Sequence, residues 1–484
     1  MEGLEISEIR LSELNTEHRF DAEYFSKENI LNSNILDKYG IIQIGSIATV
    51  TDGIHTSIDY DEKSNINLIS ATSPKFNVFD LSRGAKISKK AHLQNPRTAL
   101  KNDDVIISTV GTIGNCAVVD DSILPANSDR HVGIIRINTD YSPYVLSTFL
   151  LSKFGKFQTL RESTGNVQLN LFIYKLKEIK IPLFPLSFQQ QIETMVKDAH
   201  KKLYDANSLY AQAENLLISE LGLEGFNPSD EKVSVKSLKE SFLKTGRLDA
   251  EYYQVKYDEV MEKIFSYSNG YALLGNCCTI KDKNFMPKDE EKYHYIELAN
   301  VMNNAQITDC TISLGKELPT RARRKVSTGD VIVSSIEGSL DSVALITEEF
   351  DNALCSTGFY VINSSKLNSQ VLLTLFKSPL MFNLMKKNCS GTILTNISKD
   401  DFLSLPIPLV KKEVQDEIAG YITKSMEYSQ KAKELLQIST KSVEIAIDKG
   451  EAAALQSINQ SINQSINQSI NQSINQSISP HSLL

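Results

Sequence analysis

The sequence lacks the marks of a metal site, a membrane span and an exported protein. It contains six cysteines and seven histidines in 484 residues, and no Cys-x-x-Cys pair or other metal-ligand spacing occurs among them. No apolar run approaches the roughly 18 residues that cross a bilayer, and the polar start of the chain resembles neither a signal nor a transit peptide. We therefore expect a cytoplasmic, reduced protein with no metal and no membrane partner.

The sequence also lacks the loops that two classes of enzyme require. An adenine methyltransferase needs a glycine-rich cofactor loop and an Asn-Pro-Pro-aromatic or similar catalytic loop, whereas the Asn-Pro pairs here continue as Asn95-Pro96-Arg97 and Asn227-Pro228-Ser229. The phosphate loop of a translocating ATPase, G-x-x-x-x-G-K-[ST], does not occur either. We expect a protein that is not an enzyme, with no catalytic residue and no cofactor.

Positive charge is scarce overall, because the formal net charge is −8. Taken alone, this argues against a nucleic-acid binder, which needs Lys and Arg facing the phosphates. The charge is uneven, however, and basic residues gather in both halves of the chain. They are Lys86, Lys89, Lys90, Arg97 and Lys101 in the first half, and Arg321, Arg323, Arg324 and Lys325 in the second. Solvated surface runs and phosphate-binding patches both remain open interpretations.

The strongest signal in the sequence is an internal duplication. RFDAEYF from Arg19 returns as RLDAEYY from Arg247, and DVIISTVGTIGNCAVV from Asp104 returns as DVIVSSIEGSLDSVALI from Asp330. The offset between Asp104 and Asp330 also pairs Pro182 with Pro408, Gln189 with Gln415 and Ile192 with Ile418. A nearly constant offset over most of the chain indicates two copies of one structural unit.

Each copy changes from a strand-like to a helical pattern. VIISTV and VIVSSI are short and β-branched among turn residues, so they predict buried strands in a compact mixed domain. From Ile192 to Leu217 the apolar residues then step by 4 and 3 in turn, and the same register recurs from Ile418 to Val443. An ordinary amphipathic helix on its own domain would show this pattern too. Two such helices in a duplicated chain favour an antiparallel pair, because each can bury the other's apolar face.

The predicted helix also has a length that suits DNA. Ile192 to Leu217 is 26 residues, or roughly 39 Å of helix, while one turn of B-DNA is about 34–36 Å. Two domains held that far apart could read two half-sites on one face of a duplex. Because the two copies differ outside their shared framework, we expect a bipartite, asymmetric site.

The chain resembles the specificity subunits of Type I restriction-modification systems over almost all of its length, up to about Gly450. IKIPLFPLSFQQQIETMV from Ile179 is similar to that family's proline-containing junction between strand and helix, commonly written IPLPPLxEQ, and LPIPLVKKEVQDEIAGYI from Leu405 resembles a second copy. TDGIHTSIDY, GDVIVSSIEGSL and the R-x-D-A-E-Y elements resemble the target-recognition domains. Phe184 and Phe188, with Val410 and Lys411, depart from the usual junction residues.

The resemblance implies a DNA-binding subunit with defined partners. Each target-recognition domain would read half of a split site in double-stranded DNA, and the paired helices would set the spacing and bind two methyltransferase subunits, which restriction subunits then join. The fold class implied is α+β, with two duplicated mixed α/β target-recognition domains joined by two long antiparallel coiled-coil helices. The expected parts are an N-terminal arm (1–25), target-recognition domain 1 (26–181), a central long helix (182–228), a linker with the repeated arm (229–255), target-recognition domain 2 (256–406), a distal long helix (407–450) and a tail (451–484).

Candidate DNA contacts lie in the turns of both copies. His55, Thr56 and Ser57 follow Gly53, which permits close backbone approach, although a plain surface turn is an equal interpretation. Polar residues at or near corresponding places of the two copies complete the set, and we expect its arginines to contact phosphate rather than bases. They are Thr109, Thr112, Arg130, Arg321, Arg323, Arg324, Ser335 and Ser339.

Two other functions fit the same patterns. A coiled-coil scaffold whose flanking domains bind only protein would show the same helices, but its complex would neither discriminate duplex sequences nor lose affinity steeply with salt. The specificity subunit of a Type IIG or similar modification system would differ in its partner rather than in its chemistry.

The tail from Gln456 to Ile478 repeats Gln-Ser-Ile-Asn. An isoleucine at every fourth residue drifts by about 40° per repeat around a helix, so it forms no single stripe, and disorder or an extension of the distal helix are the two interpretations. The codons CAA, TCA, ATC and AAT would make the repeat a perfect run of the tetranucleotide CAAT. The gain or loss of one unit by slippage would then shift the reading frame, which is the basis of phase variation.

We predict that the CAAT tract varies in length. Sequencing it across many sibling colonies should reveal variants that differ in steps of four bases, because slippage adds or removes whole units. An invariant tract, or synonymous codons that interrupt the CAAT run, would remove the physical basis of a slipping switch.

Overall fold

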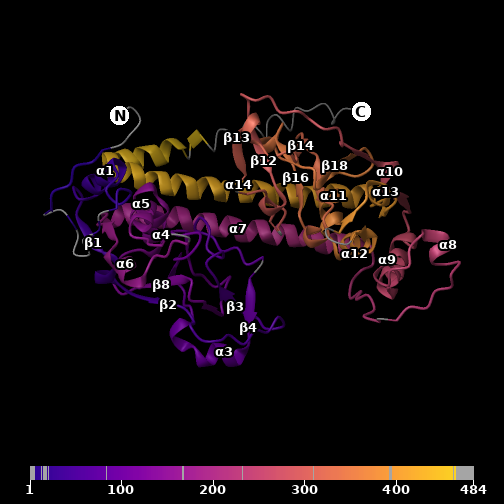
Figure 1. The fold of residues 1–484 in the computed structure, drawn as a ribbon, viewed down its shortest axis with the longest axis horizontal. Coiled ribbons are helices and arrows are strands. Elements are labelled where there is room, and N and C mark those ends of the chain that lie inside the picture. Colours follow the sequence, from indigo (N-terminus) through magenta and orange to yellow (C-terminus); the bar gives the residue numbers. More distant parts are fainter. Residues whose placement is uncertain are drawn as a thin grey trace. The chain divides into compact units, whose positions relative to one another are not determined.

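The computed structural model describes residues 6–464 except 12, 13, 15–18, 20, 83, 166, 167, 232, 303, 309, 392–394 and 462. It divides into two compact units, of which the first combines residues 1–203 with 430–484 and the second is residues 204–429. Two long helices, α7 (Leu186–Glu220) and α14 (Lys412–Lys449), each contribute one half to each unit (Figure 1). The units therefore do not coincide with the two sequence copies.

The first unit contains two larger sheets and a small one. The buried strand Val105–Ser108, predicted from its β-branched run, is an inner strand of the sheet β2-β8-β5-β6. A second sheet has the order β4-β3-β7, and β1 pairs with β9. The strands are β1 (Ile41–Gln43), β2 (Ala48–Asp52), β3 (Ile66–Ile69), β4 (Ala85–Ile87), β5 (Val105–Ser108), β6 (Cys116–Val118), β7 (Ala126–Ser128), β8 (Val132–Ile137) and β9 (Lys180–Pro182).

Short helices surround these sheets. The most apolar of them, α4, starts with Pro143 at its first turn and is buried at every later position, because it packs on β5 and β6. They are α1 (Lys27–Leu36), α2 (Ile44–Ile47), α3 (Lys89–Gln94), α4 (Pro143–Leu151), α5 (Lys153–Arg161) and α6 (Ile173–Glu178), with the 3-10 turn η2 (Pro96–Thr98).

The second unit repeats this plan. The sheet β11-β18-β15-β16 corresponds to β2-β8-β5-β6, and β10 pairs with β21 as β1 pairs with β9, whereas the other large sheet gains a strand and has the order β13-β12-β17-β14. Its strands are β10 (Tyr271–Leu273), β11 (Cys278–Ile280), β12 (Lys292–Ile296), β13 (Thr311–Leu314), β14 (Ala322–Lys325), β15 (Val331–Ser334), β16 (Val343–Leu345), β17 (Leu354–Ser356), β18 (Phe359–Ser364), β19 (Cys389–Ser390), β20 (Asn396–Ile397) and β21 (Pro406–Pro408).

The helices of the second unit follow the same order as those of the first. Two successive helices, α11 and α12, take the place of α4 and α5, and α11 packs on β15 and β16. They are α8 (Phe242–Thr245), α9 (Val255–Phe265), α10 (Leu274–Cys277), α11 (Ser369–Lys377), α12 (Pro379–Asn388) and α13 (Lys399–Leu403). The predicted fold class of two duplicated mixed domains with long helices is confirmed.

The predicted heptad seams are buried in both units. In the first unit, Ile192 and Val196 of α7 share a core with Leu436 and Val443 of α14. In the second unit, the other halves of the same helices meet, and Leu217 lies in one core with Ile418 and Ile422. Early residues of one helix meet late residues of the other, so the pair is antiparallel within each unit. Ser425, one of the polar residues in the distal seam, donates its hydroxyl to the Ala206 carbonyl at 2.7 Å.

The long helices start later than the predicted ranges of 182–228 and 407–450. Lys180–Pro182 forms β9 and pairs with β1, so the chain cannot be helical from residue 182, and α7 starts only after Pro185. α7 ends at Glu220 because Gly222 adopts a left-handed φ of 63°. The distal helix behaves alike, since β21 precedes it and Gly450, with φ 90°, ends it.

The repeated R-x-D-A-E-Y element fixes the arm of each copy to its domain. Arg19 bonds Asp21 at 2.8 Å and donates to the Arg161 carbonyl at 2.9 Å. The Tyr24 ring lies between two guanidinium groups, with Arg19 at 4.4 Å and Arg161 at 4.0 Å from its centroid. The equivalent contacts in the second copy involve Arg247, Asp249, Tyr252 and Lys387.

The tail is helical where it is described, so of the two interpretations, disorder does not hold for residues 456–461. Gly450 separates this helix, residues 451–461, from α14, so it is not a simple extension of the distal helix either. Residues 465–484, with the remaining repeats, lie outside the described part of the chain.

A buried glutamine attaches each long helix to the domain before it. Gln189 accepts the backbone N–H of Ser142 at 3.0 Å and donates to the Phe184 carbonyl at 2.8 Å. Gln415 accepts the N–H of Asn368 at 2.9 Å and donates to the Val410 carbonyl at 2.8 Å. The sequence repeat pairs the two glutamines, and each makes the equivalent contacts in its own copy.

We predict that Gln189→Ala destabilises the chain and that Gln190→Ala does not. The first change leaves the Ser142 N–H unpaired in a buried position, which costs about 1–3 kcal/mol of unfolding free energy, whereas Gln190 is exposed on the same helix. Calorimetric unfolding of the full-length chain should show a lower Tm for Gln189→Ala alone. Equal Tm values for the two variants would contradict the anchoring role.

Candidate nucleic-acid interface

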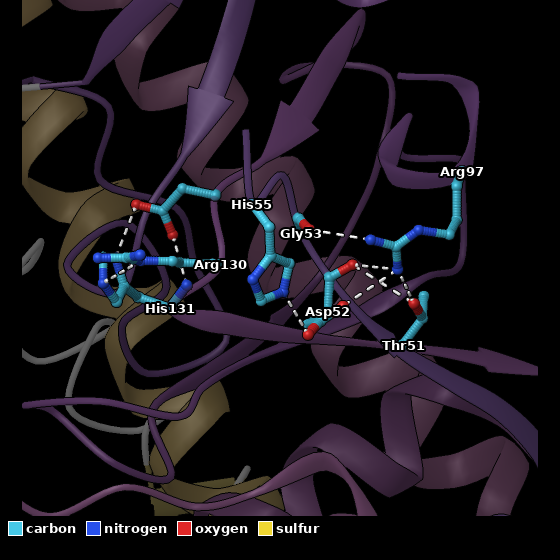
Figure 2. Close-up of polar contacts among 8 residues, drawn as sticks. Thr51, Asp52, Gly53, His55, Arg97, Arg130 and His131 are labelled. Atoms are coloured by element: carbon cyan, nitrogen blue, oxygen red, sulfur yellow. Dashed lines mark hydrogen bonds and ion pairs between the residues drawn. The ribbon is translucent and has the colours of Figure 1, made fainter. Parts of the chain in front are cut away.

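The predicted site residue His55 belongs to a polar cluster at the end of β2. Its Nε2 lies 2.6 Å from Asp52 Oδ2, and Arg97 from η2 lies 3.1 Å from the other carboxylate oxygen. Burial, which raises a carboxyl pKa, is outweighed by hydrogen bonds from His55 and Arg97, so the pKa of Asp52 is lowered. The carboxylate thus stays charged and holds two exposed basic side chains (Figure 2).

Arg97 also fixes the backbone of this turn. It donates to the Asp52 carbonyl at 2.9 Å and to the Gly53 carbonyl at 3.1 Å, and it contacts the Thr51 hydroxyl (Figure 2). The Arg97 side chain is still 55% exposed. One arginine therefore orders the turn while keeping donor groups at the surface.

Gly53 brings a second turn against the first. A Cβ on Gly53 would lie 2.0 Å from the Asp129 carbonyl oxygen, so only glycine fits here. The Ile54 N–H donates to the Ser128 carbonyl at 2.8 Å and ties the two turns together. The expectation that Gly53 serves a close backbone approach thus has a definite partner, which is protein.

Arg130 is exposed in this second turn, near His55. Its Nε lies 3.3 Å from His131 Nε2, and His131 in turn contacts Asp129 through its backbone N–H at 2.8 Å and its Nδ1 at 3.3 Å. The structure therefore gathers the predicted residues His55 and Arg130 with Arg97 and His131 on one surface (Figure 2). Thr56 and Ser57 continue from His55 and are also exposed.

The hydroxyl residues between β5 and β6 have structural contacts that recur between β15 and β16. Thr112 Oγ1 lies 3.1 Å from Ser108 Oγ, and Ser339 Oγ lies 3.0 Å from Ser334 Oγ. Thr112 also donates to the Ala71 carbonyl at 2.8 Å and is exposed, whereas Ser339 is half-buried. These hydroxyls close the turn in each copy.

Thr109 and Ser335 are buried, with 5% and 6% of their surface exposed. The Thr109 N–H donates to the His131 carbonyl at 3.0 Å, and the Ser335 N–H donates to the Gly358 carbonyl at 2.8 Å. Since His131 and Gly358 precede corresponding strands, β8 and β18, the two contacts are one framework element in two copies. Neither side chain faces solvent in this structure.

The three predicted arginines of the second copy lie at β14. Arg321 is 60% exposed and pairs with Glu297 at 3.1 Å, and the hydrogen bond to Glu297 is the main reason that its pKa is raised. Arg323 is half-buried and donates to the Thr320 carbonyl at 2.9 Å. An exposed pair of this kind contributes little stability, so Arg321 is available to another anion.

Arg324 repeats the role of Arg97. It donates to the carbonyl of Asp282, which follows β11 as Asp52 ends β2, and it bonds Asn284 Oδ1 at 2.8 Å. Lys399 contacts the Asp282 carboxylate. The sequence analysis placed Arg97 in a basic run but not at the site, although the repeat offset pairs it with Arg323 of the predicted arginine cluster, which was a usable signal.

The described residues contain no group of three or more His, Cys, Asp or Glu side chains that could hold a metal ion. Within the same part of the chain, no helix combines the length and apolarity of a membrane span.

Comparison with known proteins gives one family. A family model described as "Type I restriction modification DNA specificity domain" matches residues 22–207 and 271–437. The chain is 29% identical over 137 residues to the Type I restriction enzyme HindI specificity subunit of Haemophilus influenzae. The aligned residues cover 27% of this chain and 29% of that protein. The chain is 26% identical over 192 residues to the EcoBI specificity subunit of Escherichia coli, covering 39% of this chain and 36% of that protein. The matched part thus spans about a third of these relatives.

Solved structures that are similar to the chain include the following two. The S subunit of a Type I restriction-modification system from M. genitalium shares 12% identity, with a TM-score of 0.40 over 87% of this chain and 96% of that one. The HsdS subunit from Thermoanaerobacter tengcongensis shares 15% identity, with a TM-score of 0.26 over 85% and 97% of the two chains. Similarity at these levels concerns the fold alone.

Proposed function

Because the chain belongs to the family of Type I restriction modification DNA specificity domains, we propose that it is the non-catalytic subunit that recognises DNA in a restriction-modification complex. The observation that supports this most directly is the repeated basic surface. In each copy an arginine holds the backbone after the first strand of the main sheet, Arg97 at Asp52 and Arg324 at Asp282, and further cations surround it.

The proposed site is bipartite and asymmetric. The buried framework is alike in both copies, since both make the same backbone contact at the end of the inner strand. The exposed residues differ. His55 lies three positions after Asp52, and Phe285 lies three positions after Asp282, so these two residues are matched. Arg130 of the first copy is matched by Thr357 of the second. Two surfaces of different chemistry would read two different half-sites.

We propose the exposed residues of the predicted set as the DNA contacts. They are His55, Thr56, Ser57, Thr112, Arg130 and Arg321, together with Arg97, while Arg323, Arg324 and Ser339 support them from half-buried positions. Thr109 and Ser335 stay out of the proposed contact set, because a buried hydroxyl cannot reach a base edge or a phosphate. The arginines would mainly contact phosphates, which offsets the repulsion expected from the net charge of −8.

The proposed partners are two methyltransferase subunits and the restriction subunits that join them. The paired helices would supply the spacing between half-sites and the binding surface for the methyltransferases. A scaffold that binds only protein is the alternative, and the basic clusters at both strand ends favour DNA over it. A Type IIG modification system would differ from this proposal in its partner subunit.

We predict that the two domains specify separate half-sites. Exchange of residues 26–181 for the equivalent domain of a related chain should change one half of the methylated sequence and leave the other half and the spacer unchanged, because each surface reads independently. Mapping of methylated adenines across the genome measures this, with exchange of residues 256–406 as the matched control that should change the other half. If either exchange alters both halves, the modular proposal fails.

We predict that Arg130→Gln weakens DNA binding by the purified complex. A lost phosphate contact should lower affinity for all duplexes similarly and reduce the salt slope by about 1, whereas a lost base contact should relax one position of the site. Lys38→Gln is the control, because Lys38 is exposed in the same unit after α1. Equal affinity and salt slope for both variants would exclude Arg130 from the interface.

A further inference from the structure

The described start of the tail forms a further helix in the first unit, here called the third helix because it follows the two long helices α7 and α14. After α14 the chain turns at Gly450, whose N–H donates to the Ala446 carbonyl at 2.9 Å, and residues 451–461 are helical. Figure 1 shows this short yellow helix turning back beside the end of α14. The second half of α14 and this helix both belong to the first unit.

This helix buries one apolar face. Ala454 and Ile458 are one turn apart and fully buried, and they lie in the same core as Val443, Ala446 and Ile447 of α14. Ile458 is the isoleucine of the first Gln-Ser-Ile-Asn unit. Part of the repeat therefore belongs to the hydrophobic core.

The end of α14 is adapted to be covered on more than its heptad seam. Ser439, Thr440 and Ser442 are buried there, and each hydroxyl donates to a carbonyl of its own helix, at 2.8, 3.0 and 2.7 Å. Each polar group is thus satisfied without water. The Tyr39 hydroxyl donates to the Ala446 carbonyl at 3.1 Å. Burial, and after it a hydrogen bond with Glu451, raises the pKa of Tyr39.

The third helix departs from the duplication. After α7 ends, the chain passes Gly222 and contains no helix until α8 at Phe242, within the described residues. The extra helix follows only the second copy, and the repeat begins inside it. The family resemblance ends near Gly450, so this helix lies beyond the part of the chain that the resemblance covers.

The genetic code links the repeat to this helix. A four-base unit read in triplets returns to its first phase after twelve bases, so a CAAT tract yields CAA, TCA, ATC and AAT in the same cyclic order in all three frames. None of these triplets is a stop codon. The addition of one unit lengthens the tract by one and one-third codons and leaves every residue from Gln456 to the original end of the tract unchanged.

We propose that the first Gln-Ser-Ile-Asn unit closes the core of the first unit through Ile458, and that this closure is identical at every tract length that still encodes Ile458. Slippage then acts only on the residues that follow the repeat, and the recognition fold upstream is protected from it. The tetranucleotide repeat combines a variable end with a constant structural segment, because the same DNA encodes both. This inference does not depend on the proposed DNA contacts.

The test uses the full-length chain and four variants. Termination after Gln464 retains the third helix, termination after Gly450 removes it, Ile458→Asn places a polar group in the core, and Gln460→Ala changes an exposed residue of the same helix. Thermal unfolding gives Tm, and hydrogen exchange reports protection of residues 439–447. Termination after Gln464 and Gln460→Ala should resemble the parent, while termination after Gly450 and Ile458→Asn should lower Tm by about 5 °C and increase exchange at 439–447.

Two further measurements complete the test. Ile458→Val should give the same changes to a smaller degree, which keeps the test usable if the harsher variants do not fold. Genes with one and with three additional CAAT units, the first changing the downstream frame and the second preserving it, should give chains with unchanged protection at 439–447. The proposal is overturned if loss of residues 451–464 leaves both Tm and protection unchanged, or if protection varies with tract length.

Discussion

The burial of two long apolar seams against each other is the constraint on which the rest of this structure depends. α7 and α14 each carry a heptad stripe that would face water if the helix stood alone. Because they pair antiparallel, the start of α7 needs the end of α14, and the start of α14 needs the end of α7. Each compact unit is therefore assembled from both sequence copies, and neither copy contains a complete core of its own.

Because each unit contains halves of both long helices, the contacts that attach each helix to the preceding domain determine how that domain is held. Gln189 and Gln415 attach each helix to the domain that precedes it, through buried hydrogen bonds to both donor and acceptor groups. In the first unit a loop contact adds to this, since His200 of α7 bonds the carbonyl of Asn77 at 2.7 Å. In the second unit, Gln306 reaches Ser429 of α14 at the same distance. The orientation of each basic surface is thus set relative to a helix in its own unit.

The two copies share their buried contacts and differ in their exposed residues. Contacts such as Ser108 with Thr112 recur in the second copy as Ser334 with Ser339, and the fully buried Ser108 and Ser334 restrict which side chains fit there. Exposed positions are under no such restriction. Arg130 corresponds to Thr357, His55 to Phe285 and His131 to Gly358. A subunit that reads two unlike half-sites requires this division.

The sequence by itself determined the features that depend on local pattern and repetition. The constant offset between matched segments revealed two copies, the steps of 4 and 3 predicted the helix pair, and the β-branched runs predicted β5 and β15. These signals survive in one dimension because neighbouring residues cause them. The lengths of the helices were less accessible, since strand pairing at Pro182 and Pro408 takes residues that the predicted helix ranges 182–228 and 407–450 had included.

Tertiary structure decided which polar residues face solvent and which residues meet. Thr109 and Ser335 looked like surface hydroxyls in a glycine-rich turn, but backbone partners from a separate turn bury them. Arg97 reaches the β2 turn from a distant segment, and Gly53 meets Asp129 from across the domain. Ile458 is in the core because α14 is folded beneath it, although its repeat has no apolar stripe. Contacts between distant segments leave no periodic trace in a sequence, so only the folded chain establishes them.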